Sequence, residues 1–194
     1  AGTGAISLDA EDLTGVGDQV TAWTNTAGLK GNFVTAQIGT FRDVPRLETI
    51  SAGQTGVSKK VVRFRPSLAE RDYNCSVLKW EQTAPDSITG PKSFSAEGWV
   101  YQDTYAGWAQ AWFGWGDRNQ GGSVGLGITA ADWALGTGDA LFIPPWPAWG
   151  PGAPKGLGTF YYYATVYDSE NMTASFYING VLNQEISVGQ YDKA

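Results

Sequence analysis

The sequence of 194 residues contains no histidine and a single cysteine, Cys75. Without histidine, neither Ser-His-Asp nor Cys-His catalysis can operate, and no imidazole can hold zinc or copper. One cysteine cannot form a disulfide within the chain and is most often a small buried hydrophobe. We therefore expect any tightly bound ion to be held by oxygen ligands, as calcium is.

Positive charge and long apolar runs are scarce as well. The chain has 13 basic and 19 acidic residues, a net charge of -6, which argues against a nucleic-acid-binding protein. No stretch is apolar enough to span a bilayer. The densest basic cluster is Lys59, Lys60, Arg63 and Arg65, and a solvated strand face explains it better than an anion site. Low charge, many aromatic residues and an N-terminus without Met or an apolar leader favour an extracellular, secreted protein.

Turn-forming and strand-forming residues dominate what is present. Glycine occurs 26 times and aromatic residues make up 13% of the chain, a balance typical of an all-β protein rather than a helical one. Short strands separated by turn signals predict an all-β sandwich or jelly roll in a single domain over residues 1–194. The expected strands are Ala5–Ala10, Asn32–Ile38, Val44–Ile50, Lys60–Arg65, Ser76–Trp80, Ser93–Tyr101, Ala109–Trp115, Ser123–Ile128, Asp132–Leu135, Ala140–Ile143, Phe160–Tyr167 and Met172–Ile178, with a further strand after Asn179-Gly180.

The stretch Thr159–Val188 carries the strongest pattern. Phe160–Tyr167 is almost entirely aromatic and β-branched, and Met172–Ile178 alternates between apolar and polar residues with a period of two. Asn179-Gly180 accepts the positive φ angles of a type I′ turn. Pairing Ile178 with Val181 would place Phe176 opposite Asn183, so we expect a β-bulge in this hairpin.

The following segments occur in this order along the chain: SLDAEDL, AWTNTAG, VVRF, FSAEGWVY, FGWG, FYYYATVYD and FYINGV. Taken together, they resemble the concanavalin A-like lectin/glucanase superfamily, in its laminin-G/pentraxin form. The resemblance implies a two-sheet antiparallel jelly-roll sandwich of the concanavalin A-like type, usually extracellular, that binds glycan or protein. In that family a further segment usually returns beside the first strand. Because the chain stops at Ala194, we expect its last strand or strands to be missing, and a strand of another chain, or of a separated downstream segment, to pair near Ala5–Ala10. The alternative is that Glu185–Tyr191 returns to that edge and closes the fold alone.

Carboxylates are the first candidates for chemistry on such a fold. Glycoside hydrolysis needs two of them flanking the bond, and the Glu-x-Asp-x-x-Glu spacing of the glucanase branch does not occur. Glu97 is the best single acid, but a structural role, bonded to backbone or to a neighbouring hydroxyl, explains it better than catalysis. Calcium could be held by the loop residues Asp18, Asp117 and Asn119, although ordinary turn capping explains these residues better.

Aromatic side chains are the strongest functional signal, because apolar sugar faces stack on exposed Trp and Tyr. Trp108, Gln110 and Trp112 share one face of a predicted strand, as either a binding platform or sandwich core. Trp146 and Trp149 lie in a proline-rich loop, where exposure is the favoured interpretation.

These residues support a non-catalytic extracellular lectin-like domain that binds carbohydrate. The alternative is a structural or assembly subunit of a multi-chain complex, using aromatic loops and an open sheet edge. A glycoside hydrolase is the weakest interpretation. The expected partner is therefore a glycan or another protein chain, with no nucleic acid and no membrane span.

Overall fold

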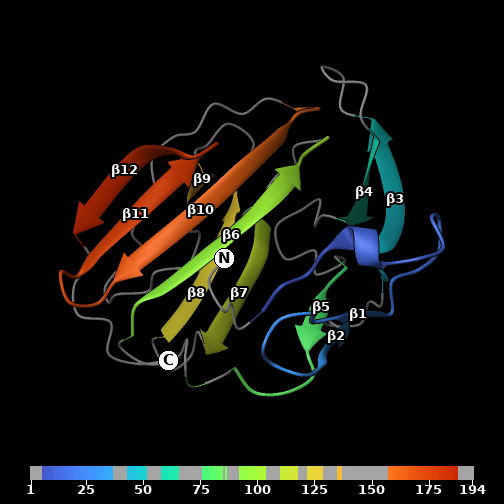
Figure 1. Ribbon diagram of the computed structural model, residues 1–194, viewed down its shortest axis with the longest axis horizontal. Coiled ribbons are helices and arrows are strands. Elements are labelled where there is room, and N and C mark those ends of the chain that lie inside the picture. The colour runs from blue at the N-terminus through green and yellow to red at the C-terminus, as the bar shows by residue number, and fades with distance from the viewer. Residues whose placement is uncertain are drawn as a thin grey trace. The chain divides into compact units, whose positions relative to one another are not determined.

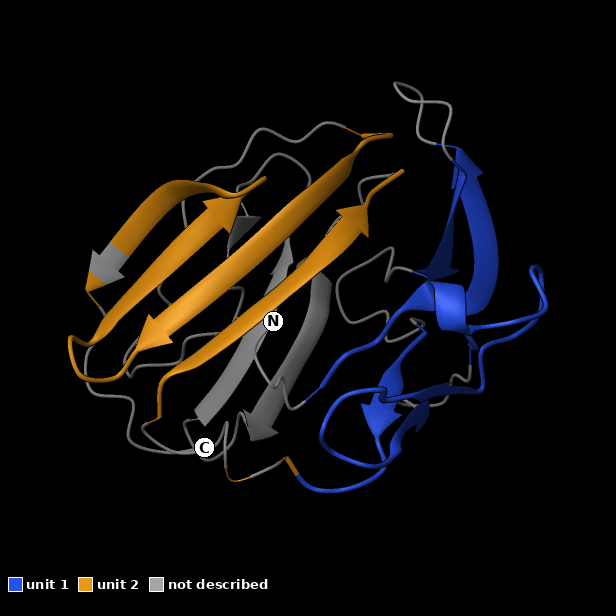
Figure 2. Cartoon of the chain, in the orientation of Figure 1, with its two compact units in different colours: residues 1–83 blue, residues 84–194 orange. Residues whose placement is uncertain are grey.

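The protein is an antiparallel β structure (Figure 1). The computed structural model describes residues 6–36, 43–51, 58–65, 76–84, 86, 92–103, 110–117, 122–128, 135–136 and 157–187, without side chains for 110–117, 122–128, 135–136 and 186. Its described residues contain one short 3-10 helix, η1 (Ala10–Asp12), and no α-helix. The chain forms two compact units, Ala1–Thr83 and Ala84–Ala194 (Figure 2). The prediction of a single domain stays a prediction.

A four-stranded antiparallel sheet organises the second unit. Its order is β12-β11-β10-β6 (Figure 1). β6 therefore pairs with β10, although β6 ends at Tyr101 and β10 begins only at Phe160. The strands are β6 (Phe94–Tyr101), β10 (Phe160–Asp168), β11 (Thr173–Ile178) and β12 (Val181–Ser187). The predicted bounds of β6, β10 and β11 lie within about one residue of the observed ones, and β12 is the further strand expected after Asn179-Gly180.

Turn chemistry sets the register of β10, β11 and β12. Asn179 and Gly180 have φ angles of 52° and 80°, as a type I′ turn requires. The predicted bulge is confirmed: the register shifts between Phe176 and Tyr177, so that Phe176 lies opposite Gln184 rather than Asn183. In the β10–β11 turn, Asp168 accepts hydrogen bonds from the backbone of Glu170 (2.9 Å) and Asn171 (3.2 Å).

One face of this sheet is buried. Along β6 exposure alternates with the predicted period of two, because Phe94, Ala96, Gly98 and Val100 share the less exposed face. The most deeply buried side chains come from the central strands β10 and β11. They are Tyr163, Thr165, Tyr167, Ala174 and Phe176. The rings of Phe94 and Tyr167 lie 5.5 Å apart between centroids, which joins β6 to β10 inside this core.

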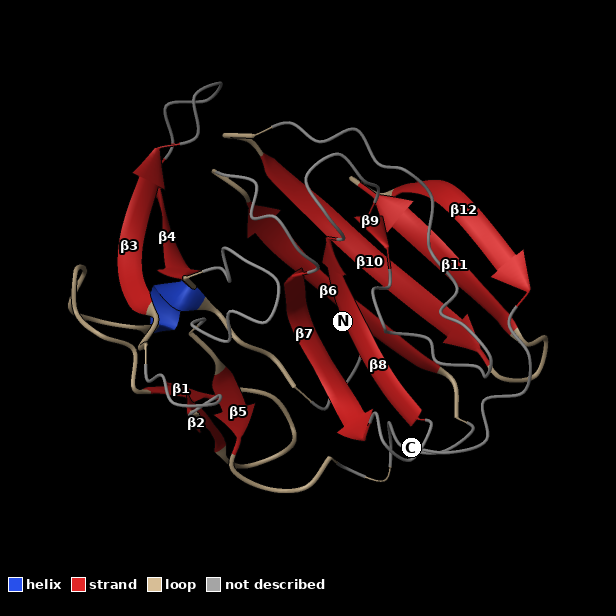
Figure 3. Ribbon diagram, turned by 180° about the vertical axis from the view of Figure 1, so that it is seen from behind, coloured by secondary structure: helices blue, strands red, loops and turns tan. Residues whose placement is uncertain are grey.

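A second sheet in this unit has the order β7-β8-β9, seen from behind in Figure 3. Its strands are β7 (Gln110–Asp117), β8 (Gly122–Ile128) and β9 (Leu135–Gly136). β7 and β8, which correspond to the predicted strands Ala109–Trp115 and Ser123–Ile128, form a hairpin in which Asp117 pairs with Gly122. The register shifts between Ala111 and Phe113, which makes Trp112 the extra residue of a bulge.

The first unit contains a three-stranded sheet of order β1-β2-β5 and a two-stranded β3-β4 sheet. The strands are β1 (Ala22–Thr24), β2 (Asn32–Thr35), β3 (Arg46–Ser51), β4 (Ser58–Arg63) and β5 (Leu78–Trp80). The rings of Phe33 and Trp80 pack at 5.0 Å across β2 and β5. Leu47 is buried beside the turn that ends at Asp18, to whose carbonyl its amide donates at 3.0 Å.

The predicted strand at Ala5–Ala10 is wrong for the described residues 6–10. Asp9 is instead the N-cap of η1: its side chain accepts a hydrogen bond from the Glu11 amide at 2.9 Å, as Asp commonly does at a helix N-cap. The Ser7 amide donates to the Asn25 side chain at 2.7 Å and its carbonyl accepts from the Thr26 amide at 3.1 Å. Because Ser7 bonds to a loop and not to a strand, the strand addition that we expected at Ala5–Ala10 loses its basis.

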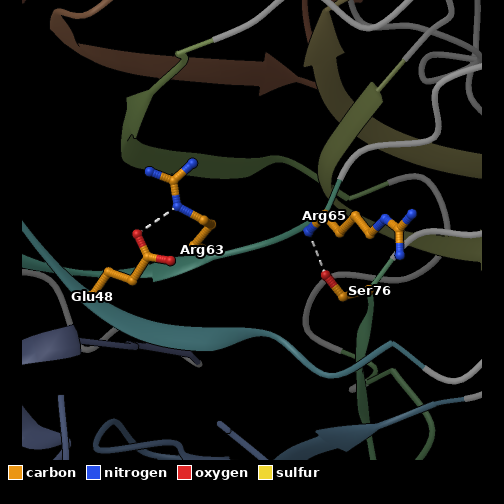
Figure 4. Close-up of polar contacts among 4 residues, drawn as sticks. All are labelled: Glu48, Arg63, Arg65 and Ser76. Atoms are coloured by element: carbon orange, nitrogen blue, oxygen red, sulfur yellow. Dashed lines mark hydrogen bonds and ion pairs between the residues drawn. The ribbon is translucent and has the colours of Figure 1, made fainter. Parts of the chain in front are cut away.

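Three members of the basic cluster, Lys60, Arg63 and Arg65, have partners within their own unit, and Figure 4 shows Arg63 with Glu48 and Arg65 with Ser76. Arg63 Nε donates to Glu48 Oε2 at 2.6 Å, and Lys60 Nζ donates to the Leu13 carbonyl at 2.8 Å. Arg65 lies 3.7 Å from Asp43, and its amide donates to Ser76 Oγ at 2.5 Å. These partners support the prediction that the cluster belongs to a strand surface rather than to an anion site.

Candidate binding face

The residues predicted from the sequence as a sugar site fall outside the described side chains. Trp108, Trp146 and Trp149 lie outside the described residues altogether. Gln110 and Trp112 are described only as backbone positions of β7, at its first residue and at its bulge. A binding role for these five residues therefore stays a prediction.

The structure reveals another group of aromatic residues, on the face of the four-stranded sheet opposite its core. Strand register brings this group together, because directly opposed residues of antiparallel strands point to the same side. Tyr162 pairs with Trp99, Phe160 with Tyr101, and Ala164 with both Glu97 and Tyr177. We call the set Glu97, Trp99, Tyr101, Phe160, Tyr162 and Tyr177 the aromatic face.

Trp99 is the most exposed aromatic residue of the aromatic face, at 68%. Its ring lies 5.3 Å from that of Tyr162, at an interplanar angle of 52°. The Tyr162 hydroxyl donates to Glu97 Oε2. The bond to a neighbouring hydroxyl predicted for Glu97 is therefore present. A large exposed ring, a hydroxyl and a carboxylate lie together on two adjacent strands.

The β11–β12 turn holds Tyr162 in place. The Asn179 side chain accepts from the Tyr162 amide at 3.0 Å, and the Asn179 amide donates to the Tyr162 carbonyl at 2.8 Å. Tyr101 and Phe160 extend the aromatic face, with ring centroids 5.0 Å apart. Backbone bonds on the rigid sheet thus fix the rings before any ligand arrives, which reduces the entropy lost on binding.

The hydrogen bond to the Glu97 carboxylate raises the pKa of Tyr162 to about 12, with smaller contributions from burial and from the Glu97 charge. Each cause favours the protonated phenol over phenolate. Tyr162 is therefore a hydrogen-bond donor throughout the physiological pH range, and Glu97 is its acceptor.

Replacing Glu97 by glutamine is expected to lower the pKa of Tyr162 from about 12 toward 10, because the charged acceptor is the largest cause of the rise. The same hydrogen bond makes stability depend on pH. Because the pKa of Tyr162 is raised in the native state, the bond stabilises that state fully below pH 10, and this contribution disappears as the pH rises through about 12. Tyrosinate absorbance, taken as the difference between each protein and its Tyr162→Phe variant, measures the shift.

Tyr163 provides the control for this titration. Burial raises its pKa to about 12, with a smaller contribution from Tyr161, and Glu97 plays no part. A difference titration against Tyr163→Phe should therefore give the same pKa with glutamate or glutamine at position 97. If Tyr162 titrates unchanged in Glu97→Gln, its hydroxyl does not donate to that carboxylate.

No metal centre is found among the described side chains, since no group of three His, Cys, Asp or Glu residues there could hold an ion. Of the predicted calcium ligands, Asp18 lies in the first unit, exposed at the turn closed by its amide and the Gly15 carbonyl. The side chain of Asp117 and all of Asn119 lie outside the described residues. Calcium binding by the three residues stays a prediction.

Comparison with known proteins identifies the family. The laminin G model of the concanavalin A-like lectin/glucanases superfamily matches residues 79–194, more than half of the chain and all of the second unit. Searches of curated proteins and of solved structures gave no match. Within the described residues, no helix is long and apolar enough to cross a membrane. The order of motifs and the antiparallel sheets agree with the family match, and the chain belongs to the concanavalin A-like lectin/glucanases superfamily.

Proposed function

We propose that this protein is a non-catalytic, extracellular lectin-like domain that binds carbohydrate on its aromatic face. The observation that carries the proposal is the exposed ring of Trp99, held against Tyr162 at 5.3 Å on the open face of the sheet. A sugar ring presents an apolar C–H face that stacks on indole. The Tyr162 hydroxyl and the Glu97 carboxylate lie beside Trp99, where they can bond sugar hydroxyls.

The carboxylates of this face support binding without hydrolysis. A glycosidase holds two carboxyl groups about 5–10 Å apart. The other carboxylates on this side of the described sheet are Glu185 on β12, three strand spacings from Glu97 on β6, and Asp168 on β10, four residues beyond the partner of Glu97. At about 4.8 Å per spacing and about 3.3 Å per residue, each is about 14 Å from Glu97, too far to flank one glycosidic bond. Glu97 and Glu185 also each accept a hydroxyl hydrogen bond, from Tyr162 and Ser175.

Trp99→Ala is expected to weaken glycan binding about 30-fold, the effect of losing a central aromatic contact worth about 2 kcal/mol. A glycan array with the unmodified protein selects the ligand, and isothermal titration calorimetry measures its Kd for both proteins. Val181→Ala is the matched control, because Val181 is equally exposed, at 69%, but lies at the β11–β12 hairpin. The proposal fails if no glycan binds saturably, or if Trp99→Ala binds as tightly as Val181→Ala.

The assembly subunit remains a second candidate because of β12. Among the described strands β12 pairs only with β11, and Val181 and Leu182 are exposed on it. An open edge with apolar side chains favours pairing with another chain. Sedimentation over a range of concentrations distinguishes the two functions, since a lectin-like domain needs no partner chain to bind sugar.

A further inference from the structure

Negative charge characterises the sheet that carries the aromatic face. Strands β6, β10, β11 and β12 contain no lysine and no arginine. On the side of the aromatic face they carry Glu97, Asp168 and Glu185, and the whole chain has a net charge of -6. A ligand approaching this face therefore meets carboxylates and, on the four described strands, no cation. Acidic glycans are repelled and cationic ones attracted.

Trp99, Tyr162 and Glu97 together have the composition of a cation site. Indole is the ring that attracts a cation most strongly, at distances within about 6 Å of its centre. Glu97 is two residues from Trp99 on the same strand and face, about 7 Å along β6. Its Oε2 accepts the Tyr162 hydroxyl, and no described group donates to Oε1. One carboxylate oxygen thus fixes the side chain beside the ring, and the other can accept from a ligand.

We propose that the aromatic face selects glycans that carry a protonated amino group, that is, amino sugars without their acetyl group. This inference rests on the proposed function, because the sugar ring must stack on Trp99. The ammonium group then donates to Glu97 Oε1 and lies over the face of the same indole ring, beside the stacked sugar. An N-acetyl group cannot replace it, since a neutral amide lacks the charge that both Glu97 and the ring attract.

Calorimetry with two glucosamine oligomers of equal length, one free and one fully N-acetylated, tests the selectivity. At about pH 6 an amine whose pKa resembles the roughly 7.7–8.0 of an α-amino group is charged. The free oligomer is expected to bind about 10-fold more tightly than the acetylated one. Raising the salt from about 50 mM to about 500 mM should weaken only the free oligomer, because an exposed ion pair is screened.

The Glu97→Gln variant tests whether the Glu97 carboxylate causes the selectivity. The variant should lose the roughly 10-fold preference, because its affinity for the free oligomer falls about 10-fold more than its affinity for the acetylated one. Glu170→Gln is the matched control, because it removes the same charge from the exposed β10–β11 turn and should keep the preference. The salt titration needs no variant, so the inference remains testable if Glu97→Gln does not fold.

The outcomes separate this inference from the proposed function. If the acetylated oligomer binds equally well or better, with loss in Trp99→Ala, the selectivity is wrong and the lectin-like function stands. If neither oligomer nor any other glycan binds, both fail. Binding of a Lys/Arg-rich peptide in place of every sugar also overturns both, since the face then recognises protein.

Discussion

In the Phe176→Ala variant the free energy of unfolding is expected to fall by about 3–5 kcal/mol. Phe176 is 1% exposed and lies on β11, between Thr165 of β10 and Gln184 of β12. Alanine removes the contacts of a whole ring and leaves a cavity that rigid neighbouring strands fill only in part. Since domains are stable by about 5–15 kcal/mol in total, the loss is a large fraction of the stability of this unit.

Urea denaturation followed by far-ultraviolet circular dichroism measures this effect, and Val181→Ala is the control. Val181 belongs to the same hairpin but is exposed, so its truncation should change the free energy of unfolding by no more than about 0.5 kcal/mol. Equal losses in the two variants would contradict the placement of Phe176 in the core.

The sheet that contains Phe176 was predictable because its signals are local. Residues Asn179 and Gly180 determine the tight turn through their positive φ angles. This turn fixes the pairing of Ile178 with Val181. From there the alternation of Ala174, Phe176 and Ile178 required one extra residue, which is the observed bulge. Turn type and period-two alternation act over a few residues, so a single sequence contains them.

The first unit was harder to predict because distant side chains determine its backbone. The residues 6–10 alternate as a strand does, but the Ser7 amide bonds to Asn25, eighteen positions away. Strand β1, Ala22–Thr24, was not predicted, since three residues carry too little periodicity and its partner β2 supplies the ladder. Such long-range bonds leave no local pattern in the sequence.

The aromatic face was only half visible in the sequence. Alternation along Ser93–Tyr101 already places Glu97, Trp99 and Tyr101 together, opposite to Phe94. Tyr162 lies beside Trp99 only because β6 pairs with β10, and these two strands are far apart in the sequence. The exposure of Trp99 also could not be read from periodicity, because either face of a sheet can be the buried one.

Asn25→Ala is expected to destabilise the first unit by about 2–4 kcal/mol, more than a polar-to-alanine change usually costs. Asn25 is buried, at 4% exposure, and its side chain satisfies three backbone groups. Oδ1 accepts from the amides of Ser7 (2.7 Å) and Ala27 (3.1 Å), and Nδ2 donates to the Leu29 carbonyl at 2.6 Å. Alanine leaves all three groups without this partner, at about 1 kcal/mol or more for each.

Amide hydrogen exchange of the 194-residue chain reports this loss at the residues where it arises. Ser7 and Ala27 should exchange faster in Asn25→Ala, because the acceptor of both amides is gone. Asn25→Asp separates the two halves of the side chain: its carboxylate still accepts from both amides but cannot donate to Leu29. It should therefore protect Ser7 and Ala27 while still unfolding more easily than the unmodified protein.

Thr26→Ala, which removes one exposed 3.3 Å bond to the Ser7 carbonyl, should change the free energy of unfolding by less than about 1 kcal/mol. If Asn25→Ala matched Thr26→Ala, the amide side chain would not hold the N-terminal segment, and the Ser7 backbone would need another partner.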